Sequence, residues 1–159
     1  MGSGRRTCRR GPLCIAYSGK AWLSEHFERF GERLEYVWTG AIFLPGRHTA
    51  FRHKMIFERW RPVTFFSAGT YDVRTTIVDA LMARGRGERG DHSWHQTVGP
   101  PSRLVEMAAR SGEMVLDPFL GSGTTGLVGL RRRFLGCDID PGAVSLALER
   151  LRTASQDSA

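Results

Sequence analysis

The first half of the chain alternates short apolar runs with amphipathic and basic segments. The run Leu13–Tyr17 predicts a buried strand, whereas residues 23–34 place apolar side chains every three or four positions, which predicts an amphipathic helix. Residues 69–92 are rich in Gly, Arg and Asp and predict a loop, in which only residues 77–82 suit a short helix. Further strands are expected at residues 36–44, 55–57 and 63–66, the last two separated by Pro62.

The second half alternates helices and strands. Ser102 is expected to be the N-cap of a helix that ends at Gly112. A buried strand over residues 114–116 leads into a glycine-rich turn and a helix, and a second strand over residues 134–137 follows. The last helix begins at the pair Asp140-Pro141, a cap followed by proline at the first helical position. Its apolar stripe consists of Val144, Ala147, Leu148 and Leu151.

This order of elements predicts an α/β domain of the Rossmann-like kind, with a mostly parallel sheet and helices on both faces. The domain is expected to span residues 13–152. Residues 1–12 have almost no apolar side chains and predict a disordered basic lead-in. Residues 153–159 are polar and predict a frayed tail.

Length and composition are those of an ordinary globular protein. The chain has 159 residues, 41% of them hydrophobic and 25% charged, which argues against a disordered or fibrous protein. No apolar run approaches the ~18 residues of a membrane-spanning helix, and no signal-peptide core follows the N-terminus. We therefore expect a cytoplasmic protein without a membrane partner. The three cysteines lack metal-ligand spacing, so no metal site is expected.

Positive charge is concentrated in the first half. The net charge is +7, and residues 1–80 carry 13 basic and 7 acidic side chains, against 10 and 9 in residues 81–159. Such asymmetry favours a surface that binds a polyanion such as DNA, although a solvated arginine-rich surface gives the same count. Residues 47–54 read as a basic loop. The candidate phosphate contacts are Arg47, Arg52, Lys54, Arg59 and Arg61.

The glycine-rich turn is the feature with chemical content. Gly121 and Gly123 allow a tight bend and a close approach of the backbone to a ligand. Asp138, at the end of the next strand, is placed to accept hydrogen bonds from ribose hydroxyls. The glycines also match the GxGxxG pattern of nicotinamide dinucleotide sites, but the carboxylate of Asp117 would repel a pyrophosphate. An acid there suits a cationic amine, as in S-adenosylmethionine.

The stretch DPFLGSGTT, residues 117–125, resembles the S-adenosylmethionine motif of the DNA amino-methyltransferases that act on N4 of cytosine or N6 of adenine. FLGCDIDPGAVSLALERL resembles the segment that follows it there. YVWTGAIFLPG and ERWRPVTFF resemble strands of phage-type or ParB-fused members, so the resemblance runs from about Leu13 to Leu151. It implies a cofactor-binding half over residues 92–152. The implied cofactor-binding residues are Asp117, Pro118, Phe119, Gly121, Ser122, Gly123, Thr124, Thr125, Asp138, Trp94 and Gln96.

One family motif is missing. The catalytic signature of these enzymes is Asp, Asn or Ser followed by Pro-Pro and an aromatic residue, and no such tetrad occurs in the 159 residues. No catalytic residue is therefore assigned, and we expect a truncated methyltransferase whose tetrad lies in a missing N-terminal segment or on a second chain. Two alternatives remain: a non-catalytic relative that binds DNA or a partner, and an NAD-dependent oxidoreductase.

Overall fold

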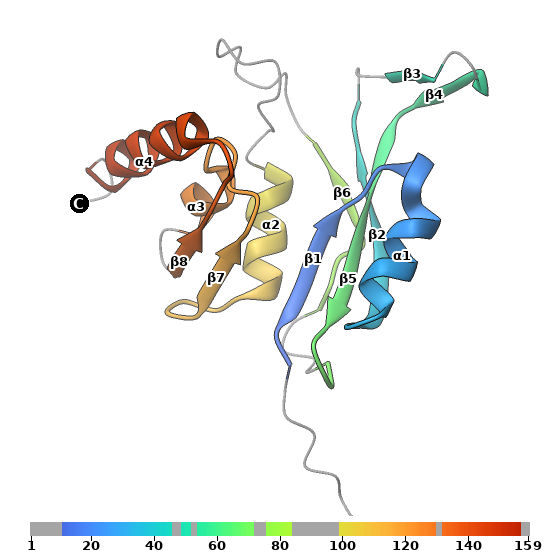
Figure 1. The fold of residues 1–159 in the computed structure, drawn as a ribbon, viewed down its shortest axis with the longest axis horizontal. Coiled ribbons are helices and arrows are strands. Elements are labelled where there is room, and N and C mark those ends of the chain that lie inside the picture. The colour runs from blue at the N-terminus through green and yellow to red at the C-terminus, as the bar shows by residue number, and fades with distance from the viewer. Residues whose placement is uncertain are drawn as a thin grey trace, which may run out of the picture. The chain divides into compact units, whose positions relative to one another are not determined.

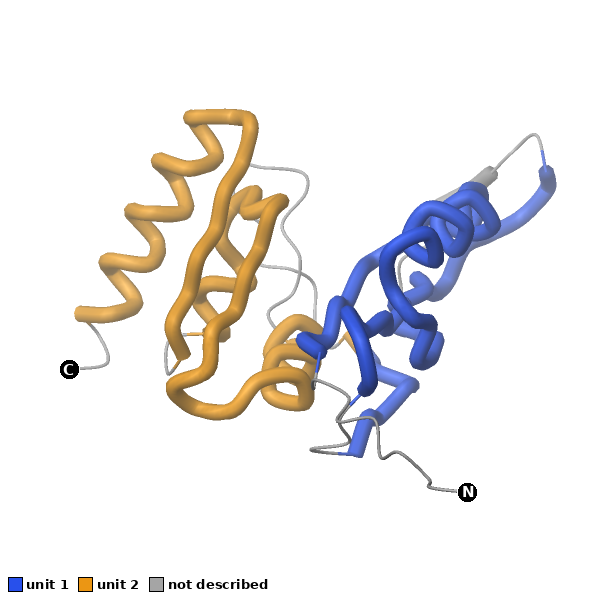
Figure 2. Tube along the Cα trace, turned by 60° about the horizontal axis from the view of Figure 1, so that its bottom comes forward, with its two compact units in different colours: residues 1–82 blue, residues 83–159 orange. Residues whose placement is uncertain are grey.

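The computed structural model describes residues 11–45, 49–51, 54–71, 76–83, 99–129 and 132–156. The chain divides into two compact units, residues 1–82 and residues 83–159, which Figure 2 shows in different colours. Each unit contains strands and helices of its own (Figure 1). The α/β class predicted from the sequence is confirmed, and the boundary between the units falls within the predicted loop.

Unit 1 contains a four-stranded sheet with the order β1-β5-β2-β6. Its strands are β1 (Leu13–Tyr17), β2 (Glu35–Phe43), β5 (Trp60–Ser67) and β6 (Ala80–Met82). β5 is antiparallel to both β1 and β2, whereas β6 is parallel to β2. The prediction of a mostly parallel sheet is therefore wrong for this unit. The reason is that the chain returns from β2 to β5 through a hairpin rather than through a crossover helix.

Two segments of unit 1 form strands where we expected a basic loop and a short helix. β3 (Thr49–Phe51) and β4 (Ile56–Glu58) pair as a small antiparallel sheet. β6 occupies the place of the expected helix, because the backbone there pairs with the edge of β2. The Ala41 N–H donates to the Asp79 carbonyl at 2.6 Å, and a Cβ on Gly40 would lie 2.6 Å from the same oxygen.

β5 runs through Pro62, where we expected an interruption. Proline lacks the N–H that an interior strand residue normally donates. Pro62 lies opposite Ala41 of β2, and the Ala41 N–H points to Asp79 on the other side, so the two residues exchange no hydrogen bond. The nitrogen of Pro62 therefore faces the β1 side, beyond the last paired residue Tyr17. Its carbonyl still accepts the Ser18 N–H at 3.2 Å.

The helix α1 (Leu23–Gly31) confirms the amphipathic pattern and packs its aromatic side chains on unit 1's sheet. The short 3-10 turn η1 (Lys20–Trp22) precedes it. Phe27 and Phe30 lie 6.0 and 5.1 Å from the ring of Phe66, which is fully buried in β5. His26 Nε2 lies 2.7 Å from the Thr64 hydroxyl, and burial lowers the pKa of this imidazole.

Unit 2 has the order helix, strand, helix, strand, helix. These are α2 (Gly99–Ala108), β7 (Met114–Asp117), α3 (Thr124–Val128), β8 (Arg133–Gly136) and α4 (Pro141–Gln156). β7 and β8 are parallel, as predicted. α4 starts at Pro141, and Asp140 accepts the Gly142 N–H at 2.8 Å, so the predicted cap is confirmed. The helix continues to Gln156, four residues into the segment expected to fray.

The start of α2 differs from the prediction. The helix begins at Gly99, so Ser102 lies inside it rather than at the N-cap. Pro100 and Pro101 are buried in the first turn, where their fixed φ suits a helix and their missing N–H groups have no helical partner to lose. Gly112 has a φ of +80° in the turn that follows α2. No helix within the described ranges is long and apolar enough to cross a membrane.

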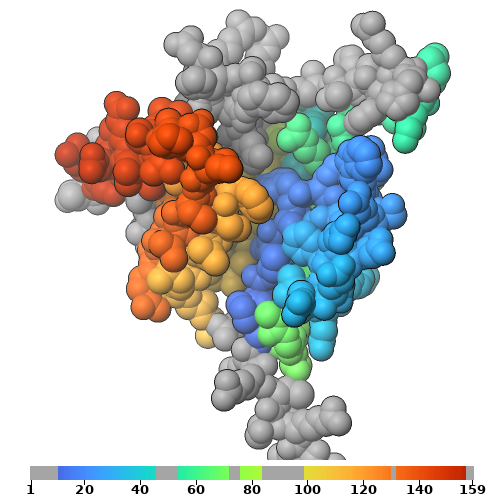
Figure 3. Space-filling view, viewed as in Figure 1, coloured from blue at the N-terminus to red at the C-terminus, as the bar shows by residue number. Residues whose placement is uncertain are grey.

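The two-stranded sheet of unit 2 has one apolar face open to solvent. Met114, Leu116 and Leu135 are 51%, 61% and 58% exposed, although we expected β7 to be buried. Phe134 points to the other face, where it approaches Gly126 of α3. The segment with β7 and β8 is open to view in Figure 3. Parallel strands are normally covered on both faces, and the helices of unit 2 cover one.

Candidate cofactor site

Asp117 ends β7 and shapes the turn that follows it. Its Oδ1 accepts the Phe119 N–H at 3.0 Å, a local turn typical of aspartate. The backbone of the next strand continues the pairing, because Cys137 N–H donates to the Asp117 carbonyl at 3.0 Å. Leu120 is buried and anchors the turn, and its N–H donates to the Cys137 carbonyl at 2.9 Å. Among the described residues, the second oxygen of the Asp117 carboxylate accepts no hydrogen bond, which leaves it to a ligand.

Gly121 and Gly123 of the loop differ in the structural requirement that favours glycine. Both have positive φ, +49° at Gly121 and +77° at Gly123, a region that side chains disfavour. A Cβ on Gly121 would meet its nearest atom at 3.9 Å, so this position is open. A Cβ on Gly123 would lie 2.8 Å from the Cβ of Ala147 in α4. Gly123 therefore allows α4 to approach the loop closely.

Asp138 joins the second strand to the loop. Its Oδ2 accepts the Gly121 N–H at 2.7 Å, and its Oδ1 accepts the Asp140 N–H at 3.0 Å. The hydrogen bonds from Asp140 and Gly121 lower the pKa of this carboxyl, so it is ionised at neutral pH. Each carboxylate oxygen accepts more than one hydrogen bond, so both remain able to bind a hydroxyl.

Two features of the site were not predicted. Gly126, the third glycine of the pattern, is a packing residue, because a Cβ there would lie 3.0 Å from both Leu151 and Phe134. Ile139 directly follows Asp138 and is 99% exposed, although it is a large apolar residue. Its side chain therefore lies in solvent beside an acid whose carboxylate is held by the backbone N–H groups of Gly121 and Asp140. In the sequence, the only signal for Ile139 as a site residue is its position directly after Asp138.

The geometry brings together most of the predicted cofactor residues. Asp117 and Asp138 lie at the carboxyl ends of adjacent parallel strands, with the loop 118–125 between them. This is the edge where open α/β sheets bind ligands. The site combines two carboxylates with exposed apolar side chains at Phe119 and Ile139. It fits a ligand with an ammonium group, ribose hydroxyls and an aromatic base, which is the chemistry of S-adenosylmethionine.

Other predicted site residues are placed only in part. Trp94, Gln96, Arg47 and Arg52 lie outside the described residues. The remaining three candidate phosphate contacts belong to unit 1 and are exposed: Lys54, Arg59 and Arg61. Within the described ranges, no three His, Cys, Asp or Glu side chains are grouped as metal ligands would be.

Comparison with known proteins identifies the family. The model of a family described as DNA methylase, N6_N4_Mtase, matches residues 19–149. The chain belongs to this DNA methylase family. DNA methylases of this kind use S-adenosylmethionine, and the family match decides against an NAD-dependent oxidoreductase.

Two curated relatives of this DNA methylase are type II methyltransferases. M.BglI of Bacillus subtilis is 25% identical over 140 residues, which cover 87% of this chain and 36% of the relative. M.MjaI of Methanocaldococcus jannaschii is 30% identical over 127 residues, 74% of this chain and 38% of the relative. The chain thus spans little more than a third of the length of either relative.

Solved structures of methyltransferases share the fold. The M1.HpyAVI–SAM complex matches 90% of this chain and 76% of that chain, with a TM-score of 0.74 and 16% sequence identity. The methyltransferase fold predicted from the sequence is therefore confirmed.

Proposed function

We propose that this DNA methylase chain binds S-adenosylmethionine at the carboxyl ends of β7 and β8. The observation that carries the proposal is the bond of 2.7 Å between Gly121 N–H and Asp138 Oδ2, which joins the loop and the second acid into one site. The bound cofactor would supply an electrophilic methyl group: the S–C bond breaks as an N–C bond forms, and the amine loses a proton.

Each residue of the site would contact a different part of the cofactor. The Asp117 carboxylate would accept the ammonium group, and Asp138 would accept the ribose hydroxyls. Ile139 and Phe119, 99% and 86% exposed, would pack on the adenine ring and remove their apolar surface from water. By resemblance, Trp94 and Gln96 would add contacts to the same ligand.

We propose that the reaction is methyl transfer to the exocyclic amine of adenine or cytosine in DNA. It requires a group that holds the flipped base, and the family's Pro-Pro tetrad is absent from this sequence. A further polypeptide segment would supply it. The exposed apolar face of β7 and β8 supports this part of the proposal, because Leu116 and Leu135 lie side by side there in adjacent strands.

Replacing the ribose-binding acid tests the cofactor site. We expect Asp138→Ala to weaken S-adenosylmethionine binding about tenfold or more, the cost of losing hydrogen bonds to a charged acceptor. Calorimetry with the full chain measures it, and NADH should not displace the bound ligand. Asp140→Ala is the matched control, since Asp140 caps α4. Equal affinity of Asp138→Ala and wild type, or efficient displacement by NADH, would refute the assignment.

Unit 1 is proposed to hold the DNA backbone. Lys54 and Arg59 stand on either side of β4, whose Ile56 and Phe57 are exposed, so cationic groups flank an exposed apolar pair. Arg61 is exposed at the start of β5. By sequence, Arg47 and Arg52 would belong to the same basic surface.

Salt dependence tests this surface. We expect the triple change of Lys54, Arg59 and Arg61 to alanine to reduce the slope of log affinity against log salt by as much as about three, because each phosphate contact contributes nearly one unit. Fluorescence anisotropy with mixed-sequence duplex DNA gives the slope. A control triple variant removes the same charge from unit 2: Arg110, Arg133 and Arg152 to alanine. Equal slopes for the two variants would show that unit 1's basic residues are merely solvated.

A further inference from the structure

The glycine-rich loop rests on one face of α4. Ala147 is fully buried beneath Gly123, where an added Cβ would lie 2.8 Å from the Ala147 Cβ. Three residues further along the helix, Arg150 donates a hydrogen bond from Nη1 to the Ser122 carbonyl oxygen at 2.5 Å. Residues three apart lie on the same side of a helix. The loop is therefore held by a steric contact and a charged hydrogen bond from the same face.

The Ser122 carbonyl has no role in the helix that follows. Gly123 is the N-cap of α3, and its carbonyl accepts the Leu127 N–H at 3.1 Å. The carbonyl of Ser122 precedes this first helical bond and lies outside the ladder. Ser122 also stands between two glycines of positive φ, and glycine adopts positive and negative φ with similar ease. The N–H groups of Gly121 and Gly123 are held by Asp138 and by the Leu120 carbonyl, and Arg150 holds the Ser122 carbonyl between them.

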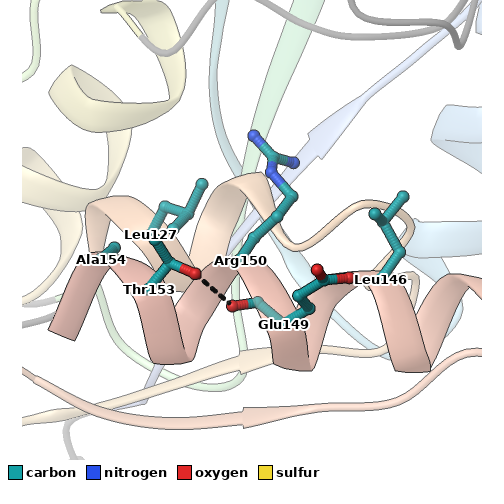
Figure 4. Close-up of a pocket in the computed structure, with 6 residues that line it drawn as sticks. All are labelled: Leu127, Leu146, Glu149, Arg150, Thr153 and Ala154. Atoms are coloured by element: carbon teal, nitrogen blue, oxygen red, sulfur yellow. Dashed lines mark hydrogen bonds between the residues drawn. The ribbon is translucent and has the colours of Figure 1, made fainter. Parts of the chain in front are cut away.

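Arg150 is suited to this task. Its guanidinium stays charged and carries five N–H donors in a rigid plane. Figure 4 shows the side chain extending from α4 with its guanidinium clear of the Glu149 carboxylate. Within the described residues it forms no salt bridge, so the hydrogen bond to Ser122 does not compete with a carboxylate. The side chain also lines a groove of about 380 Å³ along α4, together with Leu127 and Leu146.

We propose that Arg150 is a positioning residue that fixes the glycine-rich loop through the Ser122 carbonyl. It touches the loop and not the reacting atoms. By holding the peptide between Gly121 and Gly123, it keeps the Gly121 N–H on Asp138 and the loop backbone in the geometry that receives the cofactor. This inference rests on the proposed function where it concerns the cofactor, and on the structure alone where it concerns the loop.

The test compares three variants of the full chain. Arg150→Met removes the guanidinium and keeps the length of the side chain, Arg150→Lys keeps the charge, and Arg152→Met is the control at an exposed position of the same helix. Amide hydrogen exchange is measured without cofactor, at Gly121 and Gly123 in the loop and at Ala147 in α4. S-adenosylmethionine affinity is measured by calorimetry.

We expect Arg150→Met to speed exchange at both loop glycines severalfold, to leave Ala147 unchanged and to weaken cofactor binding about tenfold, the loss expected for a charged hydrogen bond. Arg150→Lys should recover part of both losses. Loop exchange equal to that of Arg152→Met would overturn the inference, as would an equal acceleration at Ala147, which indicates general destabilisation. Faster loop exchange alone, in a chain whose wild type binds no S-adenosylmethionine, would uphold the role of Arg150 and reject the proposed function.

Discussion

The chain by itself is expected to transfer no measurable methyl group from S-adenosylmethionine to DNA, even where it binds both. Its sequence contains no Asp, Asn or Ser followed by Pro-Pro and an aromatic residue. The carboxylates and the exposed Phe119 ring of the described site are assigned to the cofactor in the proposed function, so they are not assigned to the target base. Positioning of this kind contributes roughly 7–11 kcal/mol of barrier reduction. Its loss leaves no useful turnover.

Tritiated S-adenosylmethionine and mixed-sequence duplex DNA measure this transfer directly. The purified chain is assayed alone and together with an added segment that bears the tetrad. A matched segment with Ala-Ala in place of Pro-Pro is the control. Transfer only with the intact tetrad would support the proposal of a completing segment. Transfer by the chain alone would contradict it and would show that the catalytic groups lie elsewhere in these 159 residues.

Replacement of Gly123 by alanine, which fills the space between the loop and α4, is expected to lower the free energy of unfolding of unit 2 strongly. In Gly123→Ala the new Cβ would lie 2.8 Å from the Ala147 Cβ and 3.1 Å from its Cα. Overpacking of this kind costs about 1–3 kcal/mol of the free energy of unfolding. The positive φ of +77° adds roughly 1–2 kcal/mol for a residue with a side chain. The same change should also displace the loop and reduce cofactor affinity.

Gly112→Ala is the matched control for this variant. Gly112 has nearly the same φ, +80°, but a Cβ there meets no atom within 4 Å. Urea denaturation of both variants separates the cost of the positive φ from the cost of the steric clash. Both variants have the first cost, and only Gly123→Ala has the second. Equal destabilisation of the two would mean that α4 does not approach the loop as the structure shows.

The parts of the fold that sequence predicted well depend on local signals. Asp140-Pro141 marks the start of α4 because a capping acid and a proline both act within one turn. Asp117 and Asp138 could be placed together because acids that end successive parallel strands meet at one edge of the sheet. The loop between these two acids could be predicted from Gly121 and Gly123, which favour a tight turn. These predictions needed no knowledge of distant residues.

The predictions that failed depend on contacts between distant residues. β6 forms because the Asp79 carbonyl accepts a hydrogen bond from Ala41, which is far away in the sequence. The prediction of a short helix used only residues 77–82 and could not include this contact. β5 tolerates Pro62 because β1 ends opposite it. The packing of Gly126 against Leu151 and the hydrogen bond from Arg150 to the Ser122 carbonyl are tertiary contacts, and the glycine pattern reveals neither of them.

The most direct test of the cofactor site is a titration of the full chain with S-adenosylmethionine, followed by the amide signals of a ¹⁵N-labelled sample. The site predicts saturable shifts concentrated at Gly121, Gly123 and Ile139, which are reproduced by S-adenosylhomocysteine and absent with NAD. Shifts of similar size at residues of unit 1 only, or no saturable change at the loop, would contradict the assignment of Asp117, Asp138 and the glycine-rich loop as the place where this DNA methylase binds its cofactor.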